Sequence, residues 1–283
     1  MRDDFVAFIL THGRPCNVKT YHTLRKQGYT GKIYFILDNE DETIEKYEKE
    51  FGRENIIVFD KEKASANIDT ADLAQDRRTV VYARNQCFQI ASMLGFRYFL
   101  QLDDDYTKFR FRYEEGGKLR HRIANDLDAV FDCMIDFLNE SGALTVAFAQ
   151  GGDFIGGINN VFWKNRLKRK AMNTFFCDVQ KPFSFVGSVN EDVNMYTTLG
   201  NRGKLILSIA DVSVEQLATQ SNPGGLTDIY LALGTYVKSF YSVIFSPQCV
   251  KVAEMGVNYR RMHHFISWNH CTPMILPEKY KKK

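Results

Sequence analysis

The chain has 283 residues and a formal net charge of +3, with 45% hydrophobic and 13% aromatic residues. This composition supports a substantial core, lacks the strong positive field of a histone-like protein, and contains no run near the roughly 18 uninterrupted apolar residues of a membrane span. Residues 1–4 lead into a short apolar run without a cleavage-type signal, so we expect a cytoplasmic protein with no membrane partner.

The first part of the chain alternates short apolar runs with segments of helical composition. The apolar runs have the length of buried strands, and the helical segments close with glycine, as helices commonly do. Strands that alternate with helices pair in parallel, with helices on both faces of the sheet. We therefore predict an α/β fold with strands at 5–11, 32–37 and 56–60 and helices at 18–28 and 41–52.

Two longer helices follow a polar segment, 61–78, that we expect to be irregular. The first covers 79–95 and leads into a strand at 97–102. The second has apolar residues at helical spacing from Ile123 to Leu138, and a strand at 143–150 comes after it. The second half is less regular, with a helix near 191–199, strands around 204–214 and an aromatic-rich helix at about 226–245.

No repeat, low-complexity block or proline-rich linker divides the chain, so we predict one domain, 1–283. The six cysteines stand singly, without CxxC pairs. This argues against a zinc ribbon and a disulfide framework and fits reduced thiols.

Three adjacent carboxylates, Asp103, Asp104 and Asp105, end the predicted strand at 97–102. In open α/β sheets, ligands bind outside the carboxyl ends of the strands. Adjacent carboxylates repel each other unless a cation or a donor-rich ligand compensates them, and a hard divalent cation shared with nucleotide phosphates does so. A solvated turn that caps a helix is the alternative, but the position after a buried strand favours a metal site.

The segment VVYARNQCFQIASMLGFRYFLQLDDDY (80–106) resembles the core signature of GT-A fold glycosyltransferases, which is an Ala-Arg-Asn helix, a hydrophobic strand and a DxD motif. The segments ILTHGRP (9–15) and FILDNED (35–41) are similar to the loops that contact the nucleotide in that fold. The resemblance implies a Rossmann-like mixed, mostly parallel sheet flanked by helices. It also implies Mn²⁺ or Mg²⁺ and a nucleotide-sugar donor, with UDP-sugar expected. By this resemblance Asp105 ligates the metal, and the donor contacts are Thr11, Arg14, Asp38, Arg84, Asp103 and Asp104.

Several of these residues have plainer interpretations. Arg14 precedes a proline and fits a surface arginine, and Asp38 fits a cap for the helix that begins near Asp41. Arg84 is different, because it lies on an otherwise apolar helix where an uncompensated charge is costly. We therefore expect Arg84 to meet a carboxylate or a phosphate.

GT-A enzymes often supply a further metal ligand, commonly histidine, from the C-terminal region. The segment RRMHHFISWNH (260–270) offers His264, which we select, with His263 and His270 as alternatives. The pair Glu191-Asp192 is similar to the acidic pair of inverting GT-A enzymes, with Asp192 as the base and Glu191 beside it. The alternative is that this pair serves only the N-terminus of its helix.

Two glycine-rich segments, AQGGDFIGG (149–157) and NPGGLTDIY (222–230), are expected to border the acceptor and sugar pockets. Paired glycines let a backbone approach a ligand closely, although the same pattern also occurs in ordinary turns. Gly152 and Asp153 are the candidates for contacts with the sugar or the acceptor.

The arrangement of THGRP, LDDDYTKF, QGGDF and NEDVNMY resembles the TET-associated glycosyltransferases of bacteriophages. This resemblance implies sugar transfer to 5-hydroxymethylcytosine in DNA, with nucleotide-sugar binding in 1–106 and acceptor binding and catalysis in 107–283. We expect a monomer, and the acceptor base would have to be extruded from the duplex.

Basic runs at 108–113, 118–122 and 164–170 fit a polyanionic partner or, as the alternative, solvated surface. The alternative functions are a GT-A enzyme that acts on a glycan, lipid carrier or protein, and an inactive DNA-binding module. A metal nuclease ranks last, because no nuclease motif is present.

Overall fold

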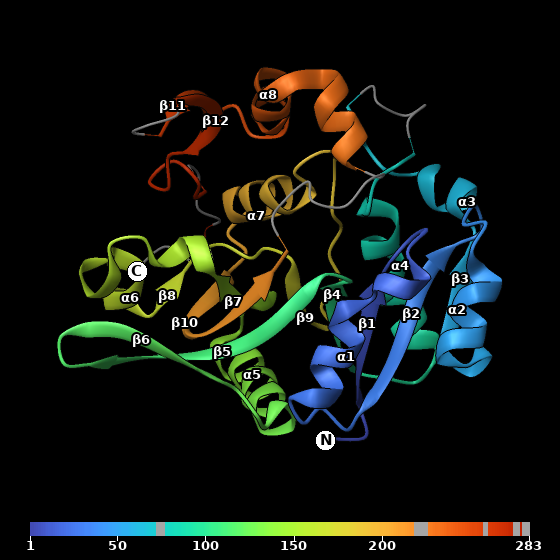
Figure 1. The fold of residues 1–283 in the computed structure, drawn as a ribbon. Helices are drawn as coiled ribbons and strands as arrows, with labels where there is room; N and C mark the ends of the chain where they lie inside the picture. Colours follow the sequence, from blue (N-terminus) through green and yellow to red (C-terminus); the bar gives the residue numbers. More distant parts are fainter. Residues whose placement is uncertain (72–76, 218–225, 257–259, 274–277, 279–283) are drawn as a thin grey trace.

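The structure is a computed structural model that describes residues 1–283 except 72–76, 218–225, 257–259, 274–277 and 279–283. Within the described residues, ten strands form one mixed sheet in the order β3-β2-β1-β4-β9-β7-β10-β5-β6, with β8 paired to β10. Helices cover both sides of this sheet (Figure 1), and a hydrophobic cluster lies on each face. The predicted α/β fold class is confirmed.

The N-terminal half of the sheet is parallel, as the alternation of strands and helices predicts. Strand β1 is buried along its whole length, because its residues alternate between the clusters on the two faces. The segment expected to be irregular contains one short helix, α3, whose N-cap Asp60 accepts a hydrogen bond from the backbone of Lys63. The elements here are β1 (Phe5–Leu10), α1 (Lys19–Lys26), β2 (Lys32–Asp38), α2 (Ile44–Phe51), β3 (Ile56–Phe59), α3 (Lys61–Ser65), α4 (Val81–Met93) and β4 (Tyr98–Asp103).

The second half of the sheet contains an unpredicted strand, β9 (Thr174–Asp178), which lies antiparallel between β4 and β7 (Thr145–Gln150). Because β9 is antiparallel to both β4 and β7, β7 runs parallel to β4. Strand β10 (Ile206–Gln216) is in turn parallel to β7. The carboxyl ends of β1, β2, β4, β7 and β10 therefore lie at one edge of the sheet, where a ligand can contact loops from both halves of the chain.

The basic run after Asp105 forms a hairpin of β5 (Tyr106–Glu115) and β6 (Lys118–Ile123), with β5 antiparallel to β10. Ile123 belongs to β6 and is 44% exposed, so its assignment to the following helix is wrong. That helix, α5 (Leu127–Ser141), begins where Asp126 caps it by accepting a hydrogen bond from the backbone of Ala129. The hairpin projects from the sheet at one end of the molecule (Figure 1).

The C-terminal region lies over helix α7 on the side away from the sheet (Figure 1). Helix α8 has a kink at Gly234, where φ is 73° and ψ is 171°. The antiparallel pair β11–β12 was not predicted. No helix within the described residues is long and apolar enough to cross a membrane. The remaining elements are α6 (Val161–Asn165), β8 (Leu167–Lys168), α7 (Glu191–Asn201), α8 (Leu226–Phe245), β11 (Val250–Met255) and β12 (Arg261–Ile266).

Candidate active site

The predicted donor residues gather at the carboxyl ends of β1, β2 and β4. Because β1 is hydrogen-bonded in parallel to both β2 and β4, the segments that follow these three strands are neighbours. They are residues 11–14, 38–41 and 103–105. The structure thus brings together, from three separate parts of the chain, the segments that the sequence analysis assigned to the nucleotide.

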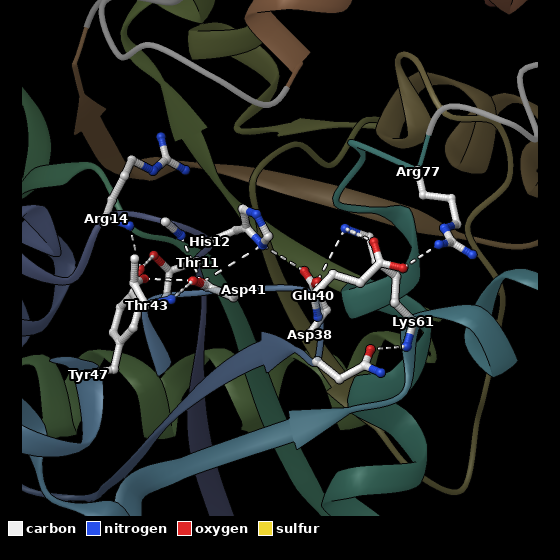
Figure 2. Close-up of polar contacts among 12 residues, drawn as sticks. Thr11, His12, Arg14, Asp38, Glu40, Asp41, Thr43, Tyr47, Lys61 and Arg77 are labelled. Carbon is white, nitrogen blue, oxygen red and sulfur yellow. Dashed lines mark hydrogen bonds and ion pairs between the residues drawn. The ribbon is translucent and has the colours of Figure 1, made fainter. Parts of the chain in front are cut away.

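Asp104 is tied into the first of these segments. Its Oδ2 accepts a hydrogen bond from Thr11 Oγ1 at 2.6 Å and lies 3.2 Å from Nη2 of Arg14. Tyr47 completes the group, because its hydroxyl lies 2.8 Å from Thr11 Oγ1 and accepts a hydrogen bond from the Arg14 backbone (Figure 2). Burial raises the pKa of Asp104, although Arg14 and Thr11 oppose this shift. Asp104 and Thr11 are therefore occupied in shaping the loop, and Arg14 is the more accessible of the three.

Asp38 holds the second segment. It lies 2.9 Å from His12 Nδ1 and 3.3 Å from Lys61 Nζ. Figure 2 shows these residues and their contacts. Burial opposes ionisation of Asp38, but the hydrogen bond with His12 and the charge of Lys61 outweigh it and hold its pKa below the usual value. The hydrogen bond to Asp38 in turn raises the pKa of His12. Asp38 is not the helix cap, since α2 begins after Thr43 and has no side-chain cap.

Asp105 is the carboxylate left without a partner in this cluster. Within the described residues, no other residue makes a hydrogen bond or ion pair with its side-chain oxygens. Burial, followed by the charges of Asp103 and Asp104, raises the pKa of Asp105 to about 7. A half-buried carboxylate with free oxygens beside two others fits a hard divalent cation.

The described residues nevertheless contain no group of three aspartate, glutamate, histidine or cysteine side chains placed to hold a metal. Because Mn²⁺ and Mg²⁺ take about six ligands, the phosphates of a donor and water would have to complete the coordination around Asp105. Asp105 therefore fits a metal ion that is held jointly by this carboxylate and by the phosphates of a bound nucleotide.

Arg84 connects this edge to the second half of the chain. Its Nη2 donates to Asp103 Oδ1 at 2.9 Å, and its Nε donates to Glu191 Oε1 at 3.0 Å. The guanidinium lies 5.0 Å from the ring centroid of Phe175 and 5.8 Å from that of Phe185. Arg84 is 1% exposed, so the expectation that this arginine meets a carboxylate is confirmed. Its predicted contact with a donor nucleotide stays a prediction.

Glu191 and Asp192 begin helix α7 and are both buried. Glu191 is engaged by Arg84, whereas Oδ1 of Asp192 accepts only the backbone N–H of Val193, at 2.7 Å, among the described residues. Burial and the neighbouring Glu191 raise the pKa of Asp192 to about 7. Asp192 therefore has the protonation behaviour that a general base at neutral pH needs.

Helix α8 packs against the start of α7 through Asn190. This residue has a left-handed backbone, with φ 52° and ψ 42°, and its side chain does not cap α7. Instead, its Nδ2 donates to the carbonyl oxygen of Lys238 at 2.7 Å and to Ser242 Oγ at 3.1 Å. The position of α8 is thereby linked to the position of the Glu191-Asp192 pair.

Asp153 is engaged within the protein. Its Oδ1 lies 2.9 Å from Lys170 Nζ and 3.5 Å from Lys168 Nζ, and its Oδ2 accepts the Gln150 backbone N–H. Gly152 is exposed, and a Cβ there would meet open space, so nothing in the protein requires a glycine at this position. Roles for Asp153 and Gly152 in sugar binding stay predictions. Of the other glycine-rich segment, residues 222–225 lie outside the described residues.

His264 lies on β12. Burial, then the charges of His263, Lys238 and Lys170, lowers its pKa to about 3, so the imidazole is neutral at neutral pH. Neutral imidazole is the form that binds metals. However, the charged neighbours that act on His264 are cationic, and Asp105 is not among them. The structure therefore does not bring the two predicted metal ligands into contact within the described residues, and the role of His264 stays a prediction.

The sequence analysis did not identify the residues that fix the loops after β1 and β2. Tyr47 from α2 and Lys61 from α3 hold Thr11 and Asp38, and Asp41 accepts the Gly13 backbone N–H at 2.8 Å. A signal existed for Lys61, because it follows strand β3 by two residues and so must lie at the ligand edge. Tyr47 has no comparable signal, because its place in the sequence is that of an ordinary core-facing residue of α2.

Comparison with known proteins places the chain in a family. Solved structures with a similar fold include a mannosyltransferase from Pyrobaculum calidifontis in complex with GDP-Man and Mn²⁺, at 10% identity and TM-score 0.49, covering 78% of this chain. This chain spans 59% of the length of that mannosyltransferase. Glucosyl-3-phosphoglycerate synthase from Mycobacterium tuberculosis, in complex with Mg²⁺ and UDP, shows 8% identity and TM-score 0.46 over 93% of this chain and 87% of its own.

No curated protein matches the sequence. A family model does match residues 5–225, which include every donor-side residue described above and the Glu191-Asp192 pair. The predicted family and the predicted enzyme class are confirmed by this match. The chain belongs to the TET-associated glycosyltransferase family.

Proposed function

We propose that the chain transfers a sugar from a nucleotide diphosphate sugar, with UDP-sugar as the expected donor, to 5-hydroxymethylcytosine in duplex DNA. The observation that carries the proposal is a pair of carboxylates without an ion-pair partner among the described residues, half-buried Asp105 and buried Asp192, on either side of the Arg84 bridge. Family membership supports the glycosyl transfer, and the basic surface of the second half supports a DNA acceptor.

The donor binds at the carboxyl ends of β1, β2 and β4 in this proposal. Arg14 and the exposed ring of His12 contact the nucleotide, while Asp38 and Asp104 keep their loops in place. Asp105 holds Mn²⁺ or Mg²⁺, which when bound offsets the negative charge of the departing diphosphate. His264 is a further candidate ligand if β12 approaches the donor in the complex.

The acceptor side is organised around Asp192. The hydroxymethyl oxygen of the base attacks the anomeric carbon, the bond from that carbon to the diphosphate oxygen breaks, and the hydroxyl proton passes to the Asp192 carboxylate. Glu191 and Arg84 hold α7 so that this carboxylate faces the acceptor. This assignment applies to an inverting reaction, in which the base acts directly on the acceptor.

The first test is mass spectrometry of nucleosides from hydroxymethylated duplex DNA incubated with the protein, Mn²⁺ and a panel of nucleotide sugars. We expect 5-hydroxymethyl-2′-deoxycytidine to gain the mass of one glycosyl unit, with no product from unmodified DNA. Asp105→Asn should lose this transfer and should also bind Mn²⁺ more weakly in calorimetry with UDP present, because a neutral amide is a poorer ligand. Transfer to a glycan, lipid or protein acceptor but not to this DNA would contradict the proposed acceptor.

The second test concerns Asp192→Asn, which should lower transfer about 10²- to 10⁴-fold, the usual contribution of a general base. At saturating Mn²⁺, which holds Asp105 in its ionised form, the wild-type rate should rise with pH around 7, because only ionised Asp192 accepts a proton, and the variant should lack this rise.

Protein stability gives an independent readout of the same group. The pKa of Asp192 is raised in the folded state, so its contribution to stability is complete below the unfolded pKa of about 4 and is lost as the pH rises through about 7. Chemical unfolding should therefore show wild type losing stability relative to Asp192→Asn over this range. A constant difference between the two proteins at all pH values would show that Asp192 does not titrate as proposed.

A further inference from the structure

The structure brings two basic segments together that are separated by about forty residues in the sequence. The hairpin β5–β6 carries six lysines and arginines against two glutamates in residues 106–123. The second segment, 164–170, carries five basic residues and no acidic one. In Figure 1 the hairpin lies beside α6 and β8 at one end of the molecule, and β6 contacts the turn Gly157–Asn159.

A small hydrophobic cluster fixes the two segments to each other. Phe154, Phe162 and Trp163 form its buried part, and Leu119 of β6 packs against it. The guanidinium of Arg112 on β5 lies 4.7 Å from the ring centroid of Phe154. The hairpin and the segment 151–170 therefore form one surface, which we call the basic platform.

The outer part of the basic platform carries cations without counter-charges. Lys118, Arg120, Arg122 and Lys164 are exposed, and none of them takes part in an ion pair within the described residues. Arg110 and Arg166 differ, because they pair with Glu215 and Asp211. Clustered cations of this kind repel one another in the free protein and favour binding of a polyanion.

The direction of the hairpin relates the platform to the site. Strand β5 begins one residue after Asp105 and has ten residues, so its far end lies about 33 Å from that carboxylate at the usual rise per residue. One turn of DNA measures about 34 Å. A duplex whose target base reaches the site next to Asp105 can therefore run along the platform for about one helical turn.

We propose that the basic platform binds the phosphate backbone of the acceptor duplex beyond the target base. The proposal rests on the proposed function, because it assumes a DNA acceptor, and it adds the surface that holds that DNA. Contacts to phosphates position a duplex without reading its sequence, so the platform contributes affinity rather than base preference.

The test compares Lys118→Glu/Arg120→Glu with a matched reversal on α2, Lys46→Glu/Lys49→Glu, whose lysines are also exposed and whose helix lies at the opposite end of the molecule from the hairpin (Figure 1). Duplex affinity is measured by fluorescence anisotropy against salt, without donor. We expect at least a tenfold loss for the hairpin variant and a log–log salt slope shallower by about 2, since two phosphate contacts are removed. The α2 variant should match wild type, and thermal unfolding should show that both variants fold.

Equal affinities and salt slopes for the two variants, or no duplex binding by wild type, would overturn the platform. Binding is measured without turnover, so the outcome is separate from that of the proposed function. A wild-type protein that binds duplex through the platform yet transfers no sugar to hydroxymethylated DNA would contradict only the proposed acceptor. If wild type transfers sugar to hydroxymethylated DNA and the hairpin variant binds the duplex as tightly as wild type, only the platform is contradicted.

A second observation concerns Ile155, which is 81% exposed in the loop that follows β7 at the ligand edge. The loop is firmly held on both sides of this residue. Phe154 is buried in the cluster of the platform, and the carbonyl oxygen of Ile155 accepts a hydrogen bond from Asn160 Nδ2 at 2.6 Å. Proteins that kink DNA insert exposed apolar side chains, isoleucine among them, between base steps.

We infer that Ile155 inserts into the duplex where the target base leaves the stack, an inference that rests on the proposed DNA acceptor. Extrusion of a base costs a few kcal/mol of stacking and pairing, and an inserted side chain offsets part of that cost. A single-stranded acceptor needs no such help, so the contribution of Ile155 should appear only with duplex.

The test measures kcat/KM on duplex and single-stranded hydroxymethylated DNA for Ile155→Ala and for Met93→Ala, a control that removes a similarly exposed apolar side chain at the end of α4. We expect the duplex-to-single-strand ratio to fall about tenfold in Ile155→Ala and to stay at the wild-type value in Met93→Ala. The same ratio in all three proteins would contradict insertion by Ile155.

Discussion

The structure depends on the charge of Arg84, which is buried with 1% of its surface exposed. Removing a guanidinium from water is costly, and the cost is offset only if anionic partners with good geometry are present. Asp103 from the end of β4 and Glu191 from the start of α7 supply this compensation, at 2.9 and 3.0 Å. Three elements from distant parts of the chain are therefore held in one arrangement, because any displacement would leave a buried charge unpaired.

The bridge also decides which carboxylates remain available for chemistry. Asp103 and Glu191 are engaged by Arg84, and Asp104 is engaged by the loop after β1. Asp105 and Asp192 are left without a cationic partner, and burial beside other carboxylates raises the pKa of each to about 7. When neighbouring carboxylates lie in different environments, their pKa values differ, and each can then perform a different chemical task. In the proposed function, Asp105 serves the donor and Asp192 serves the acceptor, and Arg84 lies between their neighbours Asp103 and Glu191.

Much of the parallel half could be predicted from the sequence, because its apolar runs and helix-ending glycines are local signals. The sequence also predicts that Arg84 contacts an anionic group, because a charge on an otherwise apolar helix must be compensated. The first strand of the hairpin also has a local signal, because KFRFRY (108–113) alternates aromatic and basic residues with the period of a half-buried strand. The same residues fit a polyanion-binding segment, so the pattern alone does not decide between the two.

Other features have no local signal. Strand β9 is five residues long and fully buried, and it is defined by pairing with β4 and β7 rather than by its own pattern. The ion pairs of Asp153 with Lys168 and Lys170 join the loop after β7 to the end of β8 and the residues that follow it, which approach this loop only in the folded chain. The cationic surroundings of His264 likewise depend on how α8 and β12 pack, which spacing in the sequence does not reveal.

A double-mutant cycle of Arg84→Met and Glu191→Gln, measured by chemical unfolding, tests the central role of the bridge most directly. In the wild-type background Glu191→Gln should destabilise the protein, by as much as about 3–5 kcal/mol, because it breaks a buried ion pair. In the Arg84→Met background the same change should stabilise the protein, because it removes an unpaired buried charge. An equal loss of stability in both backgrounds would show that Arg84 and Glu191 act independently, and would contradict the account.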